Sequence, residues 1–580
     1  MDLFDVLTMI GSLCLFLFGM NIMGEALERR AGSSLRTLLS KLTSSRLLGF
    51  VTGMGVTAII QSSSATTVMV VGFVNSGLLS LGQAINVIMG ANVGTTVTAW
   101  LLALTGIGDG NLFIQLLKPT SFTPVLAVIG VIFYVFMKDS KKKDTGMILL
   151  GFATLMFGMD AMSDAVAGLK EAQWFTDLFL LFTNPILGVL AGALLTAIIQ
   201  SSSASVGILQ ALSATGSITY AAAIPIIMGQ NIGTCITAML SSMGTTKNAK
   251  RAAFVHLLFN IIGTVMCLIL FMAVSWIFSP AILGDSVNTL GISVVHTLFN
   301  VVCTAALLPS GKLLEKLVCK LVPDATEPEK VAELDERLLT TPPVALERCR
   351  SLTLEMADCA AESLHNSISV LKSYDPVLAQ KVRDAEDRTD HYEDILGTYM
   401  VKLSALQIST EDSAEVAMLL KAIGDIERVS DHAQNIVEAA EELKEKGLQF
   451  SEQGRAELAK LLGAVEEIVE LSFRAFREND MALAWQVEPL EQVIDDLKER
   501  LRRRHIKRLQ TGECSIELGF VWSDLLTGLE RVGDHCSNIA GCVIDLHHHD
   551  MNIHQAIHAL PQENSHFAEQ YRTYTEKYKL

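Results

Sequence analysis

The sequence holds few charged residues and no clustered set of reactive ones. Only 18% of its 580 residues are Asp, Glu, Lys or Arg while 50% are apolar, which argues against an ordinary soluble enzyme. Its ten cysteines form no Cys-x-x-Cys pair, so we expect a reducing compartment and no disulfide framework. No nucleophile, base and orienting group stand together, and no Walker or Rossmann loop is present. We therefore expect no enzymatic activity.

Negative charge is concentrated in the C-terminal part of the chain. Residues 1–328 have a formal charge of about +2 and residues 329–580 of about −19, within an overall charge of −17. This balance argues against nucleic acid as a partner, because phosphate backbones favour clustered Lys and Arg. The acidic part indicates solubility or cation binding. The N-terminus lacks the basic start of a cleaved signal peptide, so we expect its first apolar run to be retained.

Seven apolar stretches are long enough to cross a bilayer, which takes about 20 helical residues at about 1.5 Å each. They cover residues 6–27, 84–104, 121–137, 145–166, 222–243, 252–276 and 290–308. Two shorter apolar pairs, 47–60 with 66–80 and 186–199 with 205–215, have arms too short to span. Polar groups at mid-depth are tolerated only inside protein or water, so each pair is predicted to form a re-entrant hairpin with a polar tip.

Basic residues predict the orientation, since short cytoplasmic loops collect Lys and Arg. Such residues lie in the segments 29–46, 138–143 and 247–251. Seven crossings then place the N-terminus outside and the C-terminal domain in the cytoplasm. The first hairpin would enter from inside and the second from outside, so the two halves are predicted to be inverted repeats.

Three motifs recur at one offset of 139 residues, which indicates a duplication. The segment Gln-Ser-Ser-Ser at 61–64 recurs at 200–203, Gly-x-Asn-x-Gly-Thr at 90–95 recurs at 229–234, and Phe-Gly-Met at 18–20 recurs at 157–159.

The repeated polar tips suit the binding of small ions. Hydroxyl and carbonyl oxygens suit Na⁺, while N–H groups at a helix start suit an oxyanion. Neither hairpin contains Lys or Arg, so an anion's charge would be met by helix dipoles, backbone donors and co-bound cations. The alternative is that these small polar residues only allow close helix packing.

These motifs resemble the type II sodium/phosphate cotransporter family, whose hallmark is two inverted repeats that each bear a Gln-Ser-Ser-Ser hairpin. The resemblance covers about residues 1–310 and implies symport of Na⁺ with inorganic phosphate by alternating access. Cys235 stands where the first repeat has Thr96, and Ser205 stands where it has Thr66. The substrate and sodium site implied by the resemblance is Gln61, Ser62, Ser63, Ser64, Thr66, Thr67, Asn92, Thr95, Thr96, Gln200, Ser201, Ser202, Ser203, Ser205, Asn231 and Thr234.

The acidic part has apolar residues at helical spacing, which predicts about six amphipathic helices and no strand. A Glu-Arg-Val-x-Asp-His segment at 427–432 recurs at 530–535. Its Glu and Asp lie on one helix face, so paired helices could present four carboxylates to a cation. Solvated faces with local ion pairs are the alternative, and we prefer it for the similar spacings at 386–390 and 491–495.

The same segments resemble the phosphate-uptake-regulator (PhoU) family, which has two three-helix repeats with metal-binding acidic motifs. The resemblance covers about residues 345–548. It implies a divalent, iron or zinc metal at Glu427, Asp431, Glu530 and Asp534.

The predicted fold is therefore all-α: a polytopic membrane protein with two inverted repeats and re-entrant hairpins, followed by a soluble cytoplasmic helical bundle. The domains are a transmembrane domain at 1–310 (repeats about 6–137 and 145–276, extra span 290–308), a linker at 311–343, a PhoU-like bundle at 344–550 and a tail at 551–580.

The expected function is sodium-coupled phosphate transport across the inner (plasma) membrane with a cytoplasmic regulatory domain, and Na⁺ is the coupling ion. Phosphate export, transport of another small anion, and a membrane-anchored signalling scaffold stay open. The expected partners are inorganic phosphate, sodium, the lipid bilayer and a second copy of the chain in a homodimer, without nucleic acid.

Overall fold

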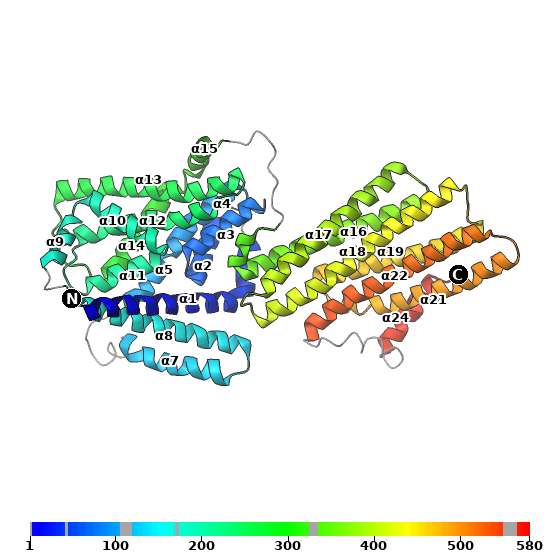
Figure 1. Ribbon diagram of the computed structural model, residues 1–580, viewed down its shortest axis with the longest axis horizontal. Coiled ribbons are helices and arrows are strands. Elements are labelled where there is room, and N and C mark those ends of the chain that lie inside the picture. The colour runs from blue at the N-terminus through cyan, green and yellow to red at the C-terminus, as the bar shows by residue number, and fades with distance from the viewer. Residues whose placement is uncertain are drawn as a thin grey trace. The chain divides into compact units, whose positions relative to one another are not determined.

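The computed structural model describes residues 3–40, 45–104, 119–167, 169, 173–323, 334–548 and 565–580. Within these ranges the regular structure is helical and no strand is present. The chain divides into an N-terminal unit, Met1–Ala345, and a C-terminal unit, Leu346–Leu580 (Figure 1). The all-α prediction is confirmed.

The described residues of the N-terminal unit form α-helices and short 3₁₀ helices. They are α1 (Leu3–Ser40), α2 (Arg46–Ile60), α3 (Ser63–Asn75), α4 (Leu81–Gly94), α5 (Thr96–Ala103), α7 (Pro119–Phe136), α8 (Ser140–Val166), α9 (Gln173–Leu181), α10 (Pro185–Ile199), α11 (Ser202–Ser213), α12 (Tyr220–Ser241), α13 (Lys247–Phe278), η3 (Ala281–Gly284), α14 (Thr289–Leu307), α15 (Gly311–Leu321) and η4 (Glu336–Thr340). The helix α15 lies within the predicted linker and buries Leu314 and Val318.

The duplication seen in the sequence is repeated in the packing of the helices. In the first repeat α2 packs on α4, and in the second α10 packs on α12. A side chain at Gly90 would overlap the carbonyl oxygen of Phe50, and one at Gly229 would overlap that of Val189. Both contacts are offset by 139 residues. Glycine at these two positions therefore lets each helix pair approach backbone to backbone.

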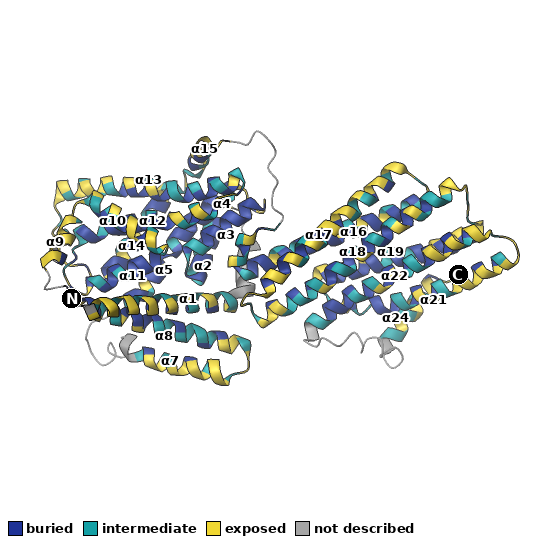
Figure 2. Ribbon diagram, viewed as in Figure 1, coloured by how far each residue is buried: buried dark blue, intermediate teal, exposed yellow. Residues whose placement is uncertain are grey.

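Large apolar side chains lie exposed on the outer helices of the N-terminal unit, as the yellow faces of α7 and α13 show (Figure 2). Val128, Ile269 and Trp276 are 61%, 58% and 86% exposed. Soluble proteins rarely expose contiguous apolar surface of this kind, whereas lipid accommodates it. The N-terminal unit is therefore an integral membrane domain.

Among the described residues, six helices are long and apolar enough to cross a membrane, against seven predicted. They are Phe4–Arg30, Leu81–Ala103, Ser140–Val166, Tyr220–Ser241, Lys247–Phe278 and Thr289–Leu307. The seventh predicted crossing, 121–137, falls on α7, whose described apolar part Phe122–Phe136 is shorter than the other six. The whole of α7 has 18 residues, which is about 27 Å at about 1.5 Å per residue, so it stays the candidate for the seventh crossing of a bilayer core of about 30 Å.

The C-terminal unit is a bundle with six long helices, as predicted. They are α16 (Pro342–Lys372), α17 (Pro376–Ser404), α18 (Thr410–Glu445), α19 (Glu452–Glu478), α21 (Val487–Gln510) and α22 (Ile516–His548), with the short α20 (Met481–Ala484). The helix α18 packs on α17 and α22, and α22 also packs on α19 and α21. The predicted tail contains a further helix, α24 (Ser565–Lys577), which packs on α21. The Tyr571 hydroxyl donates to Asp496 there, a long-range contact that sequence spacing does not reveal.

Candidate functional site

Each predicted hairpin is two short helices joined at a sharp break. Hairpin one is α2 and α3, and hairpin two is α10 and α11; their arms have 12 to 15 residues. The breaks fall at Gln61 and Gln200, which adopt left-handed backbone with φ of 60° and 58°. Such a conformation is costly for a residue with a side chain, so the same left-handed break at two equivalent positions shows that the duplication extends to the backbone.

The serine after each glutamine caps the second helix of its hairpin. The Ala65 N–H donates to Ser62 Oγ, and the Ala204 N–H donates to Ser201 Oγ, at 3.2 Å in both cases. The next serines begin the helices, where the first N–H groups lack partners within the helix. Ser63, Ser202 and Ser203 are buried, while Ser64 is partly buried. Each tip therefore offers hydroxyl oxygens to a cation and N–H groups to an anion.

A hydroxyl pair ties the two arms of each hairpin together. Thr57 Oγ1 donates to Thr66 Oγ1 at 3.0 Å, and Thr196 Oγ1 donates to Ser205 Oγ at 2.8 Å. Ser205 stands at the position of Thr66 in the second repeat, and it keeps this hydroxyl–hydroxyl hydrogen bond. Thr67 donates to its own helix at the Ser63 carbonyl, which leaves its oxygen lone pairs available as acceptors.

The two glutamine side chains differ, although their backbones agree. Gln61 is 7% exposed, and its Oε1 accepts a hydrogen bond from Thr98 Oγ1 at 2.9 Å. Gln200 is exposed. Thr237, the repeat equivalent of Thr98, has a buried Oγ1 without a hydrogen-bond partner. The tip of hairpin one is thus held by α5, whereas the corresponding bond in hairpin two is not made. The sequence analysis missed Thr98 and Thr237. The recurrence of Gly-Thr-x-x-Thr-Ala at 94–99 and 233–238 was the available signal.

The Gly-x-Asn-x-Gly-Thr segments lie on buried parts of α4 and α12. Asn92 and Asn231 donate to the carbonyl oxygens one turn earlier, at 3.1 and 2.9 Å. Thr95, Thr96 and Thr234 donate in the same way, each to a backbone carbonyl of the preceding turn.

Cys235 replaces the hydroxyl of Thr96 and donates weakly to the Asn231 carbonyl at 3.5 Å. It also accepts from Asn260 Nδ2 at 3.3 Å. The thiol therefore connects α12 to α13. In the first repeat, the described hydrogen bond of the Thr96 hydroxyl stays within its own segment, at the Val93 carbonyl.

A buried His-x-x-x-Asn pair on α13 and another on α14 were missed in the sequence. In each, the asparagine Nδ2 donates to the histidine carbonyl at 2.9 Å, from Asn260 to His256 and from Asn300 to His296. The Oδ1 atoms of both asparagines are buried without a partner. The recurrence of His-x-Leu-Phe-Asn at 256–260 and 296–300 was the available signal. Unpaired buried carbonyl oxygens can accept from water or bind a cation.

In the C-terminal unit the predicted carboxylates of α18 lie beside those of α17. Burial, followed by the charge of Asp431, raises the pKa of Glu427 to about 7. The charges of Glu393 and Asp390 also contribute, so α17 faces this position. Arg428 pairs with Asp431 at 3.1 Å and with Glu427 at 3.7 Å. Asp390, in the segment 386–390 that we predict to be a solvated face, is exposed, and its charge still acts on Glu427 of α18.

The second predicted pair has the same arrangement between α21 and α22. Burial, followed by neighbouring carboxylates that include Asp495 and Asp534, raises the pKa of Glu491 to about 8. Glu530 forms an ion pair with Lys498 at 2.8 Å. No three His, Cys, Asp or Glu side chains converge as a ready set of metal ligands within the described ranges. The neighbouring carboxylates repel one another when they are ionised, and a hard cation bound between them would reduce that repulsion.

Sequence comparison identifies both units. Residues 15–164 and 155–296 each match the family described as Na⁺/Pi-cotransporter, and residues 353–440 and 458–543 each match the PhoU domain. The first match covers the two hairpins one by one, and the second covers the two acidic motifs one by one.

Similar proteins span the whole chain or one of its units. A candidate inorganic phosphate export protein, YjbB of Salmonella typhimurium, is 26% identical over 93% of this chain and 97% of its own length. The uncharacterized protein YqeW of Bacillus subtilis is 32% identical over 53% of this chain and 95% of its own length. The crystal structure of PhoU from Pseudomonas aeruginosa is 27% identical over 35% of this chain and 98% of that chain, with a TM-score of 0.34. The chain belongs to the Na⁺/Pi-cotransporter family, a family of phosphate transporters, and carries a C-terminal PhoU domain.

Proposed function

We propose that the N-terminal unit carries inorganic phosphate together with Na⁺ across the plasma membrane by alternating access. The observation that carries this proposal is the difference between the two hairpin tips. Their backbones match at Gln61 and Gln200, but only Gln61 is buried and bonded to Thr98. Two equivalent halves in two different states are what alternating access around one central site requires.

The chemistry of the tips supports the pairing of an anion with a cation. Helix starts at Ser63 and Ser202 present N–H groups and a positive dipole end to phosphate. The hydroxyl oxygens of the serines and threonines are neutral acceptors of the kind that Na⁺ prefers. The only basic side chain in the two hairpins is Arg46, at the opposite end of α2 from the tip, so co-bound Na⁺ would supply the missing positive charge at the tips. We therefore propose that phosphate and Na⁺ bind at the residues that the sequence predicts for this site.

The proposed orientation is an inverted pair of repeats with the N-terminus outside and the C-terminal unit in the cytoplasm. It rests on the basic segments 29–46, 138–143 and 247–251. A cysteine at position 142 should then react with an impermeant label only from inside, and a cysteine at 285 only from outside.

Export of phosphate is the second candidate, favoured by the name of the similar YjbB protein. The same residues would serve import and export, since the direction of a coupled transporter follows the gradients that it meets. Import and export therefore differ in the cell rather than in the site.

The proposal is tested with purified protein in liposomes and labelled phosphate, with and without an imposed Na⁺ gradient. We expect Na⁺-dependent flux in the wild type and its loss in Gln61→Ala and in Gln200→Ala, with normal insertion of both. Phosphate flux that does not depend on the Na⁺ gradient would rule out coupling to Na⁺. Wild-type flux in both variants would remove the hairpins from the mechanism, and no flux in the wild type would favour a signalling scaffold.

We further propose that the C-terminal unit binds metal and regulates transport. The carboxylates of Glu427 and Asp431, and of Glu530 and Asp534, would hold the ion, and the α17 and α21 carboxylates beside them complete the two clusters. An ion shared between helices would stabilise the bundle, because its binding energy adds to that of the folded form. Replacing these four residues with Ala should abolish bound metal in elemental analysis while basal phosphate flux persists. Equal metal content in the variant would reject the site.

A further inference from the structure

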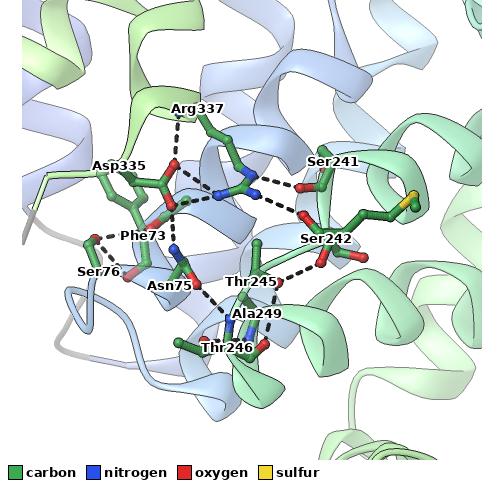
Figure 3. Close-up of polar contacts among 12 residues, drawn as sticks. Phe73, Asn75, Ser76, Ser241, Ser242, Thr245, Thr246, Ala249, Asp335 and Arg337 are labelled. Atoms are coloured by element: carbon green, nitrogen blue, oxygen red, sulfur yellow. Dashed lines mark hydrogen bonds and ion pairs between the residues drawn. The ribbon is translucent and has the colours of Figure 1, made fainter. Parts of the chain in front are cut away.

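A short segment directly before α16 binds two separate parts of the N-terminal unit. Residues 335–341, which include η4, contact the end of α3 and the turn after α12 (Figure 3). We call this segment the clasp. The end of α3 belongs to the first repeat, whereas the turn at 242–246 belongs to the second. The clasp therefore joins the two repeats at one end of the membrane unit.

The centre of the contact is a buried asparagine held from both sides. Asn75 Nδ2 donates to Asp335 Oδ2 at 2.7 Å, and the Thr246 N–H donates to Asn75 Oδ1 at 2.8 Å. Asn75 and Asp335 are 6% and 3% exposed. A donor on one side and an acceptor on the other fix the amide in one orientation. In the second repeat the position equivalent to Asn75 is Ala214, so only hairpin one can form this connection.

An arginine extends the contact to the end of α12. Arg337 Nε donates to the Ser241 carbonyl at 2.6 Å, and its Nη2 donates to the Met243 carbonyl at 3.1 Å. The same guanidinium pairs with Asp335 at 3.1 Å (Figure 3). Carbonyls at a helix end lack partners within the helix, and a cation there is favourable. Asp335 thus links Asn75 and Arg337 into one polar network.

An apolar side chain anchors the clasp beside this network. Leu338 is fully buried and faces α3 at Gly72, where a side-chain carbon would lie 3.0 Å from Leu338 Cδ2. Glycine at this position leaves room for the leucine. The clasp therefore combines a partly buried ion pair, a bridging amide and an apolar anchor, which are more contacts than a simple connecting segment needs.

We propose that the clasp holds hairpin one in the state in which Gln61 is buried and bonded to Thr98, which we call closed. The C-terminal unit controls the hairpin through the clasp. The helix α3 begins at the hairpin tip with Ser63 and ends at the clasp with Asn75. A helix of 13 residues transmits a displacement at one end to the other, about 20 Å away. The clasp continues directly into α16, the first helix of the bundle, so a change in the bundle reaches α3 through the main chain. This inference rests on the proposed role of the hairpins.

The first test measures the backbone opening of the hairpin tip and does not depend on transport. Asn75→Asp places a carboxylate against Asp335 and should open the clasp, because two buried like charges repel. We expect hydrogen exchange of the backbone amides at 57–67, in the full-length protein, to become at least about tenfold faster. A merely structural contact would speed exchange only near residues 73–76 and 241–247, and that result would overturn the proposal.

A charge swap distinguishes the clasp from general damage to the fold. The double variant Asn75→Asp with Asp335→Asn restores one donor and one acceptor, so exchange at 57–67 should return to within about threefold of the wild type. Thr340→Val is the matched control, because Thr340 is exposed and its hydroxyl bonds only within the turn, to the Arg337 carbonyl. Failure of the double variant to recover, with the control unchanged, would contradict the pairing of these two side chains.

The second test asks whether the clasp must open during transport. Cysteines at 75 and 335, joined by a short reducible cross-linker, should stop phosphate flux, and reductant should restore it; the single variant Asn75→Cys with the same reagent is the control. Flux that continues in the cross-linked protein would overturn the inference. Absence of flux in the wild type would instead reject the proposed transport function, while the exchange result would still decide whether the clasp controls the tip.

Discussion

The hydrogen bond between Thr98 and Gln61 is the smallest feature that separates the two hairpins. Gln61 is buried and its Oε1 accepts from Thr98, whereas Thr237 Oγ1 is buried with no partner and Gln200 is exposed. A buried hydroxyl without a partner costs about 1–3 kcal/mol. In the proposed alternation, closure of hairpin two would bring Gln200 to Thr237 and supply this partner.

We expect Thr98→Val and Thr237→Val to impair phosphate flux to a similar extent, although only Thr98 is bonded here. Valine keeps the shape of threonine and removes the hydroxyl, so Thr98→Val should cost the closed form of hairpin one about 1 kcal/mol. If the hairpins alternate, Thr237→Val should cost the closed form of hairpin two a similar amount. Initial rates of labelled phosphate uptake in liposomes measure both. Normal rates in Thr237→Val would show that hairpin two does not close in the way that hairpin one does.

At the scale of helices, α19 and α21 in the C-terminal bundle are held together by a buried carboxylate between two arginines. Glu457 accepts from Arg508 at 2.6 Å and from Arg504 at 2.9 Å. Burial alone would raise the pKa of Glu457, but the hydrogen bonds from the arginines outweigh it, so the pKa lies below its usual value. Glu457 and Arg508 are 5% and 8% exposed, so loss of either partner would leave a buried charge.

We expect Glu457→Gln to destabilise the bundle by about 3–5 kcal/mol at neutral pH, because Arg508 loses its counter-ion. Since the pKa is depressed in the folded state, the carboxylate stabilises the fold above its unfolded pKa of about 4.3, and this contribution is lost as the pH falls below that value. The difference between variant and wild type should therefore shrink in acid. Hydrogen exchange of α19 and α21 against pH measures it.

Glu470→Gln serves as the control on the same helix, since Glu470 is exposed. It should leave exchange in α19 and α21 near that of the wild type at every pH. A similar loss in both variants would mean that total charge on α19, and not the buried ion pair, stabilises the bundle.

For the whole molecule, both hairpins and both Gly-x-Asn-x-Gly-Thr segments lie in the N-terminal unit, so transport should not need the C-terminal bundle. A chain that ends at Pro323 should still move phosphate but lose control by intracellular metal or phosphate. A chain that ends at Thr341 keeps the clasp and lacks the bundle. Comparing the flux of both with the full protein separates the clasp from the bundle, and an inserted but inactive fragment in both cases would make the bundle an obligate part of the transporter.

The sequence by itself determined the helical class, the membrane unit, the acidic bundle and the duplications. The length of an apolar stretch and the helical spacing of apolar residues depend only on residues close together in the sequence. A repeat is found by comparing the chain with itself. The positions of Gln61 and Gln200 at the hairpin breaks also agree with the motif. The helix α24 did not follow from the same patterns, since it depends on what it packs against.

Only the tertiary structure decided which polar groups meet. Thr98 reaches Gln61 across 37 residues, and Asp335 reaches Asn75 across 260. Two carboxylates of α17, Glu393 and Asp390, act on the pKa of Glu427 in α18, which spacing along one helix does not reveal. A side chain's partner depends on how distant helices pack, and that packing is set by the sum of many small contacts that no single motif encodes.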